Sequence, residues 1–204
     1  PAAEGVGGWG GHAVAPVSKK MSAIAARKAS FSAGVPMVTR RQPLREVVDV
    51  NDLVNEVCAM VSHDFKRHGV QIEKDLASES LPVRVDPVQI EQVLINLVRN
   101  ALDALLDVSE PDRWLRVTST HTSPDRVMVC VEDRGSGISA PALEQLFDPF
   151  FSTKDSGMGM GLAISQTIVS NHHGKIRAES EAGNGSRFTM ELPSHVETSI
   201  SAAS

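Results

Sequence analysis

The sequence predicts a two-layer α/β sandwich, in which a mixed, mostly antiparallel sheet is covered on one face by about three helices. Three long segments place apolar residues at helical spacing, so each would form a helix with one apolar side. Two pairs of predicted strands are joined by short turns and must therefore be antiparallel. Amphipathic helices bury their apolar sides against a sheet, which places the helices on one face of the strands.

Local signals mark where the expected elements begin and end. Asn51 is predicted as the N-cap of the first helix, Gly69 as the residue that ends it, and Pro87 as part of the first turn of the second helix. The expected elements are a strand at 44–50, a helix at 51–67, strands at 70–76 and 83–86, a helix at 87–107, strands at 114–121 and 126–133, a long connection at 134–159 with a short helical piece at 140–146, a helix at 160–172, and strands at 175–180 and 186–192.

Charge is distributed unevenly along the chain. Residues 1–45 contain seven basic residues and one acid, whereas residues 46–204 contain 13 basic and 24 acidic residues. An acidic folded part argues against nucleic acid as a partner. Residues 1–43 are rich in Gly, Ala, Ser and Pro and are predicted to be disordered or a linker. We expect the domain to span 44–193 and a flexible tail to span 194–204.

Cysteine usage and hydropathy bear on the cellular compartment. Cys58 and Cys130 are isolated in the sequence, with no C-x-x-C pair. Two lone cysteines fit buried thiols in a reducing cytosol better than a disulfide framework. No apolar run approaches the ~18 residues of a membrane span. We therefore expect a cytoplasmic domain.

The segment Gln92–Ala104 carries the strongest functional signal. On a helix its apolar residues form one broad face, and a narrow polar row forms opposite them. Asparagines contribute little as helix surface, but their amide oxygens suit a hard cation such as Mg²⁺ that keeps most of its waters. A polar edge on a half-buried helix is the alternative that this segment alone leaves open. The polar row is Gln92, Asn96, Arg99, Asn100 and Asp103.

A carboxylate followed by glycines ends a predicted strand at Asp133-Arg134-Gly135-Ser136-Gly137. The carboxylate can accept a hydrogen bond from an exocyclic amine such as that of adenine, and the glycines let the backbone approach a flat ligand. The pattern is weak by itself, because an ordinary strand-ending turn has the same residues.

Two further segments flank the last predicted helix. Gly157-Met158-Gly159-Met160-Gly161-Leu162 opens that helix, and glycines there would expose the free amides that bind phosphate at a helix N-terminus. Neither the Rossmann nor the G-x-x-x-x-G-K-[ST] spacing is present. Phe147–Lys154 has three phenylalanines that must pack on something, so we expect them to anchor a flexible lid, with one ring covering an adenine face. Lys154 is then a candidate phosphate contact.

The order of these four motifs resembles one family. An asparagine-rich helix, D-x-G-x-G, F-x-P-F-F-S-T-K and GMGMGL follow one another in the catalytic and ATP-binding domain of sensor histidine kinases. That domain belongs to the ATPase superfamily shared with gyrase, MutL and a heat-shock chaperone, and the resemblance is greatest to the nitrogen- and oxygen-sensing subgroup. It covers about residues 44–193 and implies a Bergerat-type fold that binds ATP and Mg²⁺.

The resemblance implies a role for each matching residue. Asn96 is expected to ligate Mg²⁺, Asn100 to reach the phosphates or the metal, and Asp133 to bind the adenine amine. Two glycines of the second motif lie beside the ring, and three of the last line the phosphate turn. The implied nucleotide-binding residues are Asn96, Arg99, Asn100, Asp103, Asp133, Gly135, Gly137, Ile138, Phe150, Phe151, Thr153, Lys154, Gly157, Gly159, Met160, Gly161 and Leu162.

Two departures from the family pattern bear on the reaction. Gyrase-type ATPases place a glutamate where this chain has Gln92, and an amide cannot act as a general base on water. Glu91 points roughly 100° away on the helix. Many histidine kinases have a lysine where this chain has Asp103, and we expect Arg99 and Lys154 to replace it. These residues favour transfer to another nucleophile over hydrolysis.

The phosphate-accepting histidine of such kinases has no match in this sequence. His63-Asp64-Phe65 resembles an acceptor box only superficially, and His172 and His173 suit a helix C-terminus better than a metal site. The resemblance therefore implies as partners a histidine-containing dimerisation domain and a response regulator, with this fragment monomeric and its parent a homodimer. Two alternatives stay open: a gyrase- or chaperone-type ATPase, and an interaction module that binds ATP without transferring it.

Overall fold

The computed structural model describes residues 44–153 and 158–195. The predicted order of elements is confirmed, and no boundary moves by more than two residues. The elements are β1 (Glu46–Asp49), α2 (Val50–Arg67), β2 (Gln71–Leu76), β3 (Pro82–Val85), α3 (Pro87–Leu106), a 3-10 turn (Glu110–Asp112), β4 (Trp114–Ser123), β5 (Arg126–Asp133), α4 (Ala140–Glu144), α5 (Gly161–Asn171), β6 (Lys175–Ser180) and β7 (Ser186–Pro193).

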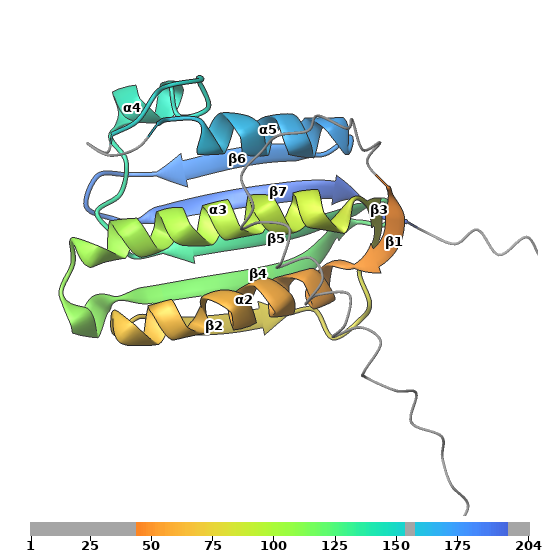
Figure 1. Cartoon of the computed structure of the whole chain (residues 1–204), viewed down its shortest axis with the longest axis horizontal. Coiled ribbons are helices and arrows are strands. Elements are labelled where there is room, and N and C mark those ends of the chain that lie inside the picture. The colour runs from red at the N-terminus through yellow and green to blue at the C-terminus, as the bar shows by residue number, and fades with distance from the viewer. Residues whose placement is uncertain (1–43, 154–157, 196–204) are drawn as a thin grey trace, which may run out of the picture. The chain divides into compact units, whose positions relative to one another are not determined.

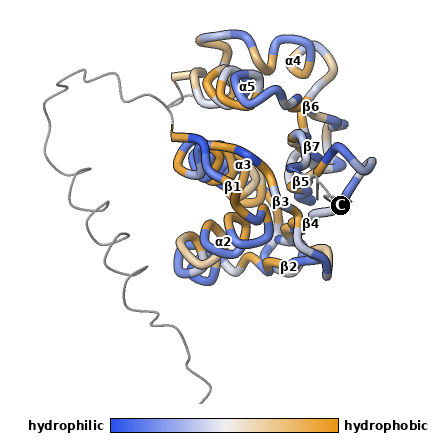
Figure 2. The backbone as a smooth tube through the Cα atoms, turned by 90° about the vertical axis from the view of Figure 1, so that its right-hand side faces the viewer, coloured by the Kyte–Doolittle hydropathy of each residue, from blue (hydrophilic) through white to orange (hydrophobic). Residues whose placement is uncertain are grey.

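The main sheet has five strands in the order β2-β4-β5-β7-β6. β2 and β4 run parallel, and the other neighbours are antiparallel. The helices α2, α3 and α5 lie along one face of this sheet (Figure 1). The view turned by 90° separates the helices and the strands into two layers (Figure 2). The predicted fold class, a two-layer sandwich with a mixed, mostly antiparallel sheet, is confirmed.

Two strands differ from the expectation of a single sheet. β1 and β3 pair only with each other in an antiparallel two-stranded sheet, apart from one isolated bridge between Val83 and Ser194. Each is four residues long and leads directly into a helix, β1 into α2 and β3 into α3. Their position is therefore set by the helix starts, at the end of the domain away from α4 (Figure 1).

The predicted N-cap of α2 was wrong. Asp49 is the N-cap residue, and its carboxylate accepts a hydrogen bond from the backbone amide of Asn51 at 2.9 Å. The side chain of Asn51 instead contacts β4, where its Oδ1 atom accepts a hydrogen bond from Ser119 Oγ at 2.5 Å. Asp and Asn are both favourable N-cap residues, so the sequence alone does not show which of these two positions begins the helix.

One apolar core lies between the helical layer and the sheet. The apolar face predicted for α3 is buried, with Val93, Leu94, Leu97, Val98 and Ala101 each at most 2% exposed. Facing it, alternate residues of the central strands are buried to a similar degree. This burial holds α3 on the middle of the sheet, which turns its narrow polar row away from the core.

The thiols and the chain ends complete the fold. Cys58 and Cys130 are both buried and unpaired, and burial raises the pKa of each thiol. Within the described ranges, no helix has the length and apolar character needed to cross a membrane. The predicted linker at 1–43 lies outside the described residues. Just beyond the predicted domain end, the amide of His195 donates a hydrogen bond to the carbonyl of Pro82.

Candidate functional site

The polar row of α3 is accessible along the helix. Gln92, Arg99 and Asp103 are exposed, whereas Asn96 and Asn100 are half-buried. Residues three and four apart share one side of a helix, so these five side chains follow one another along about three turns. The two amides are thus the most enclosed members of the row, which is where a ligand-holding group would lie.

Asn96 contacts the first turn of α5. Its Nδ2 atom donates a hydrogen bond to Ser165 Oγ at 3.0 Å, and Ser165 Oγ donates to the carbonyl of Gly161 at 3.0 Å. The Asn96 oxygen lies against the α-carbon of Gly161, because a Cβ atom added to Gly161 would come within 2.5 Å of Oδ1. A glycine at this point is therefore what permits the close approach of α3 and α5.

The N-terminus of α5 has no side-chain cap. Among the described residues, the N-cap residue Met160 makes no side-chain capping hydrogen bond, whereas α2 and α3 are capped by Asp49 and Asp86. The first amides of a helix lack intrahelical partners, and the helix dipole makes that end partly positive. An uncapped N-terminus beside an asparagine oxygen is a suitable place for phosphate and its cation.

Asp133 ends β5 in a buried position, with only 3% of its surface exposed. Its Oδ1 atom accepts a hydrogen bond from the amide of Gly135 at 2.8 Å. Burial raises the pKa of this carboxyl group to about 6, opposed by hydrogen bonds from the backbone amides of Gly135 and Ser186. Such a carboxylate is held in one orientation and retains acceptor capacity for a donor that enters its pocket.

The glycines after Asp133 fit against neighbouring backbone. A Cβ atom on Gly135 would lie 2.7 Å from both the Cβ and the carbonyl oxygen of Ala104 on α3. Gly137 has a φ angle of +69°, and a Cβ atom there would lie 2.0 Å from the carbonyl oxygen of Glu181. The loop is therefore held between α3 and the β6–β7 turn. Ile138 follows, with its amide donating to Ser180 Oγ at 2.8 Å.

The lid segment is pinned at its base by one backbone hydrogen bond. The amide of Phe150 donates to the carbonyl of Gly159 at 2.9 Å, and both residues have positive φ angles, +67° and +64°. A positive φ at a phenylalanine is a strained conformation of a kind that gathers at functional sites. The hydrogen bond closes the loop between these residues, so the lid and the α5 N-terminus are joined at their bases.

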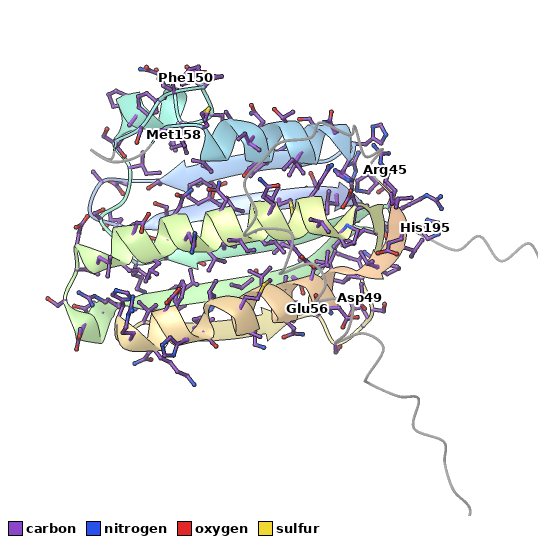
Figure 3. All side chains as sticks on the ribbon, viewed as in Figure 1. Arg45, Asp49, Glu56, Phe150, Met158 and His195 are labelled. Atoms are coloured by element: carbon purple, nitrogen blue, oxygen red, sulfur yellow. The ribbon has the colours of Figure 1, made fainter. Side chains whose placement is uncertain are left out.

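Two of the three lid phenylalanines are half-buried and one is exposed. Phe150 is 77% exposed and Met158 is 76% exposed, and both lie at the α4 end of the domain (Figure 3). Phe147 and Phe151 are half-buried and Thr153 is exposed. Lys154 and Gly157, both predicted phosphate contacts, lie outside the described residues.

The remaining predicted site residues lie at the start of α5. Met160 precedes the helix as its N-cap residue, and Leu162 is half-buried in its first turn. Sequence reasoning missed Ser165, Ala104 and Ser180, which support the site without resembling a motif. Of these three residues, only Ser165 has a sequence signal: it is a polar residue on the side of the predicted helix that is otherwise apolar.

Other candidate groups lie elsewhere. His63 is exposed on α2. His172 is 3% exposed, and its Nε2 atom accepts a hydrogen bond from the amide of Asp86 while Nδ1 donates to the carbonyl of Ile168. His172 is thus at the C-terminus of α5, as predicted, and it also contacts Asp86, the N-cap residue of α3. Within the described residues, no three or more His, Cys, Asp or Glu side chains are grouped to hold a metal ion.

One cavity among the described residues lies away from these side chains. It has a volume of about 460 Å³ and is lined by Val47, Pro82, His121 and His195 among others. His195 lies at the opposite end of the domain from Phe150 (Figure 3). The motif residues therefore gather around α3, the start of α5 and the end of β5, away from this cavity.

Comparison with known families covers the whole motif region. Residues 85–196 match the family described as Histidine kinase-, DNA gyrase B-, and HSP90-like ATPase. This range is more than half of the 204-residue chain and includes all four motifs.

Similar proteins include several sensor kinases. Sensor protein FixL of Bradyrhizobium diazoefficiens is 39% identical over 156 residues, which cover 76% of this chain and 30% of FixL. Sensor histidine kinase TmoS of Ectopseudomonas mendocina is 36% identical over 76% of this chain and 16% of TmoS. Sensor histidine kinase ZraS of Escherichia coli K12 is 36% identical over 74% of this chain and 31% of ZraS. The chain thus spans less than a third of the length of these relatives.

Solved structures give the same picture. The catalytic domain of histidine kinase ThkA superposes with a TM-score of 0.65 at 33% identity, covering 73% of this chain and 95% of that domain. ThkA in complex with the response regulator protein TrrA superposes with a TM-score of 0.61 at 27% identity, covering 87% of this chain and 48% of ThkA. In length and fold, the described domain corresponds to the catalytic part of ThkA.

Proposed function

Because the chain belongs to the family of histidine kinase-, DNA gyrase B- and HSP90-like ATPases, we propose that it is the ATP-binding catalytic domain of a two-component sensor histidine kinase. It binds Mg-ATP and transfers the γ-phosphoryl group to a histidine on a separate dimerisation domain. Its relatives of known type are sensor kinases, and the chain corresponds to less than a third of each of them.

One observation carries the proposal: α3 contacts both glycine segments of the site. Asn96 meets Gly161 at the start of α5, and Ala104, about two turns further along α3, meets Gly135 beside Asp133. A base-binding carboxylate and a phosphate-binding helix start are therefore held by the same helix. This arrangement suits a nucleotide whose adenine reaches Asp133 and whose phosphates reach α5.

The residues present also fit a magnesium ion. Clustered acidic ligands are absent from the described residues, so protein oxygens would supply only a small part of the coordination shell. Mg²⁺ binds readily in this way, through one or two protein oxygens together with phosphates and waters. Asn96 and Asn100 would hold the ion, which neutralises phosphate charge when bound.

Transfer is favoured over hydrolysis by the residues around the phosphates. Gln92 is exposed on α3 one turn before Asn96, and an amide cannot take a proton from water. Phosphoryl transfer needs positioning and electrostatic stabilisation more than covalent chemistry from the protein. An imidazole presented by a partner domain can therefore serve as the nucleophile without a base from this chain.

The partners follow from the same proposal. The dimerisation domain of the parent kinase supplies the histidine, and a response regulator receives the phosphoryl group afterwards, as the ThkA–TrrA complex suggests for ThkA. The isolated chain is monomeric, its parent is a homodimer, and the domain works in the cytoplasm. The buried, unpaired thiols of Cys58 and Cys130 support a reducing compartment.

Radiolabelled ATP tests this proposal directly. The chain is incubated alone and with the histidine-containing dimerisation domain of its parent, with Asn96→Ala as the control. We expect acid-labile, base-stable label on the partner only when both domains are present, and strongly reduced label with Asn96→Ala. Rapid ATP hydrolysis by the chain alone would favour the ATPase alternative, and ATP binding without any transfer would favour the interaction module.

A further inference from the structure

We propose that Ser165 is a positioning residue that sets which side of the Asn96 carboxamide faces the phosphate site. The inference rests on the proposed function, because it concerns the metal ligand of that site. Ser165 lies on α5, contacts no nucleotide in this account, and acts only through Asn96. None of the four motifs includes it.

The direction of the hydrogen bonds carries the inference. A serine hydroxyl has a single proton, and Ser165 Oγ donates that proton to the carbonyl of Gly161 at 3.0 Å. Its oxygen is then left as an acceptor, and Asn96 Nδ2 donates to it at 3.0 Å. Because Ser165 can offer only an acceptor, the NH₂ group of Asn96 must face it, and the oxygen must face the other way.

Burial strengthens this preference. Ser165 is 2% exposed, so bulk water does not compete for its hydroxyl group. A carboxamide turned by 180° would place its oxygen against the Ser165 oxygen, two acceptors with no proton between them, and the hydrogen bond between the two side chains would be lost. In the observed orientation the Asn96 oxygen lies beside the α-carbon of Gly161, at the uncapped start of α5.

The orientation matters because only one end of a carboxamide can bind a hard cation. The oxygen is a ligand for Mg²⁺, whereas the NH₂ group has no free lone pair to offer. With Ser165 in place, the ligand atom faces the α5 N-terminus before any nucleotide binds. Without it, the carboxamide would populate both orientations, and metal-dependent affinity would fall.

A purely structural role for Ser165 makes a different prediction, and α5 offers a matched control. Thr167 Oγ1 donates to the carbonyl of Ala163 at 2.9 Å, the same bond to the residue four positions earlier that Ser165 makes. Thr167 is exposed, and its only described side-chain hydrogen bond is that one. Ser165→Ala and Thr167→Ala therefore remove the same helical contact, but only the first releases Asn96.

Calorimetric titration with ADP, with Mg²⁺ and with EDTA, separates the two roles. We expect Ser165→Ala to weaken binding about three- to tenfold in Mg²⁺, as for loss of one neutral hydrogen bond. Binding in EDTA should not change, and Thr167→Ala should match the wild type in both. In the absence of nucleotide, the side-chain amide resonances of Asn96 should shift or broaden in Ser165→Ala alone. An unchanged ratio of the Mg²⁺ and EDTA affinities in folded Ser165→Ala would overturn the inference.

The double variant distinguishes this failure from failure of the proposed function. If Ser165 acts through Asn96, then Ser165→Ala should have no further effect on affinity in an Asn96→Ala background. An equal loss in both backgrounds would mean that Ser165 acts on its own, which contradicts the inference. Wild-type protein that binds no ADP, or binds it equally with and without Mg²⁺, would instead contradict the proposed site itself.

Discussion

The two ends of the α3–α5 pair are built in opposite ways. At the closed end, defined by Asp86 and His172, polar side chains satisfy the backbone: Asp86 caps α3, and the His172 ring links the Asp86 amide to the carbonyl of Ile168. At the open end, defined by Asn96 and Gly161, the N-cap residue Met160 makes no side-chain capping hydrogen bond among the described residues, and Gly161 adds no side chain beside Asn96. The same two helices are thus locked at one end and left accessible at the other.

This difference separates the groups that stabilise the fold from the groups that are available to a ligand. Satisfied backbone groups at the closed end contribute to the free energy of unfolding. Towards the open end lie a helix start without a side-chain cap among the described residues and the buried carboxylate of Asp133, whose charged form is disfavoured by burial. A ligand that binds these groups would stabilise the folded state. Substitutions at the closed end should therefore lower stability and leave nucleotide affinity intact, and substitutions at the open end should do the reverse.

The largest expected effect concerns Asp133 and pH. Burial raises its pKa from 3.8 to about 6, so the folded state favours the protonated form. Its contribution to stability is fully present below pH 4 and is lost as pH rises through about 6. We expect Asp133→Asn to gain stability relative to the wild type as the pH rises through this window, reaching on the order of 3 kcal/mol above the folded-state pKa in the nucleotide-free state.

Denaturant unfolding of both proteins between pH 4.5 and 7, a window set by the pKa values above, measures this gain. ATP affinity of the wild type should rise with pH over the same range, because the adenine amine donates to the ionised carboxylate. If the difference in stability between the wild type and Asp133→Asn did not change with pH, the raised pKa of Asp133 would be contradicted.

The next effect tests the closed end. His172→Ala removes the acceptor of the Asp86 amide and leaves a cavity in place of a 3% exposed ring. We expect a loss of about 2 kcal/mol in the free energy of unfolding. The dissociation constant for Mg-ATP, measured where the variant is fully folded, should stay near the wild-type value. A weakened affinity with unchanged stability would reverse the roles of the two ends.

A smaller effect is expected at the cap itself. Asp86 Oδ1 accepts hydrogen bonds from the amides of Val88 and Gln89 at 3.1 and 3.3 Å. Asp86→Ala should lower the free energy of unfolding by about 1 kcal/mol, as is typical for loss of an N-cap. Asp86→Asn keeps a capping oxygen and serves as the control, with most of the stability retained. Equal losses in the two variants would show that the cap oxygen is not the cause.

Sequence predicted the fold well because its signals are local. The spacing of Leu94, Leu97 and Ala101 defines the buried face of α3, and Pro87 marks its start, so neither depends on distant contacts. The split of β1 and β3 from the main sheet depends on tertiary pairing, which no pattern within a four-residue strand can encode.

Motif residues could be predicted from the sequence, but the residues that support them could not. Asp133 and Asn96 stand out because the four motifs that contain them follow one another in the order of a known family, although each motif is weak by itself. Ser165 and Ala104 contact residues 69 and 31 positions away, and these contacts exist only once α3 packs against α5 and against the loop after β5. Phe150, one of the predicted lid phenylalanines, is 77% exposed, and its contact with a nucleotide stays a prediction.

Substitution of Gly161 should have the smallest effect on stability, and it tests the proposed site most directly. An added Cβ atom would lie 2.5 Å from Asn96 Oδ1, so Gly161→Ala must displace that oxygen, while alanine in a helix is favoured over glycine by about 1 kcal/mol. We expect a melting temperature close to that of the wild type and a Mg-ATP affinity at least roughly tenfold weaker. Unchanged affinity in the folded Gly161→Ala protein would contradict a nucleotide site at the meeting point of Asn96 and α5.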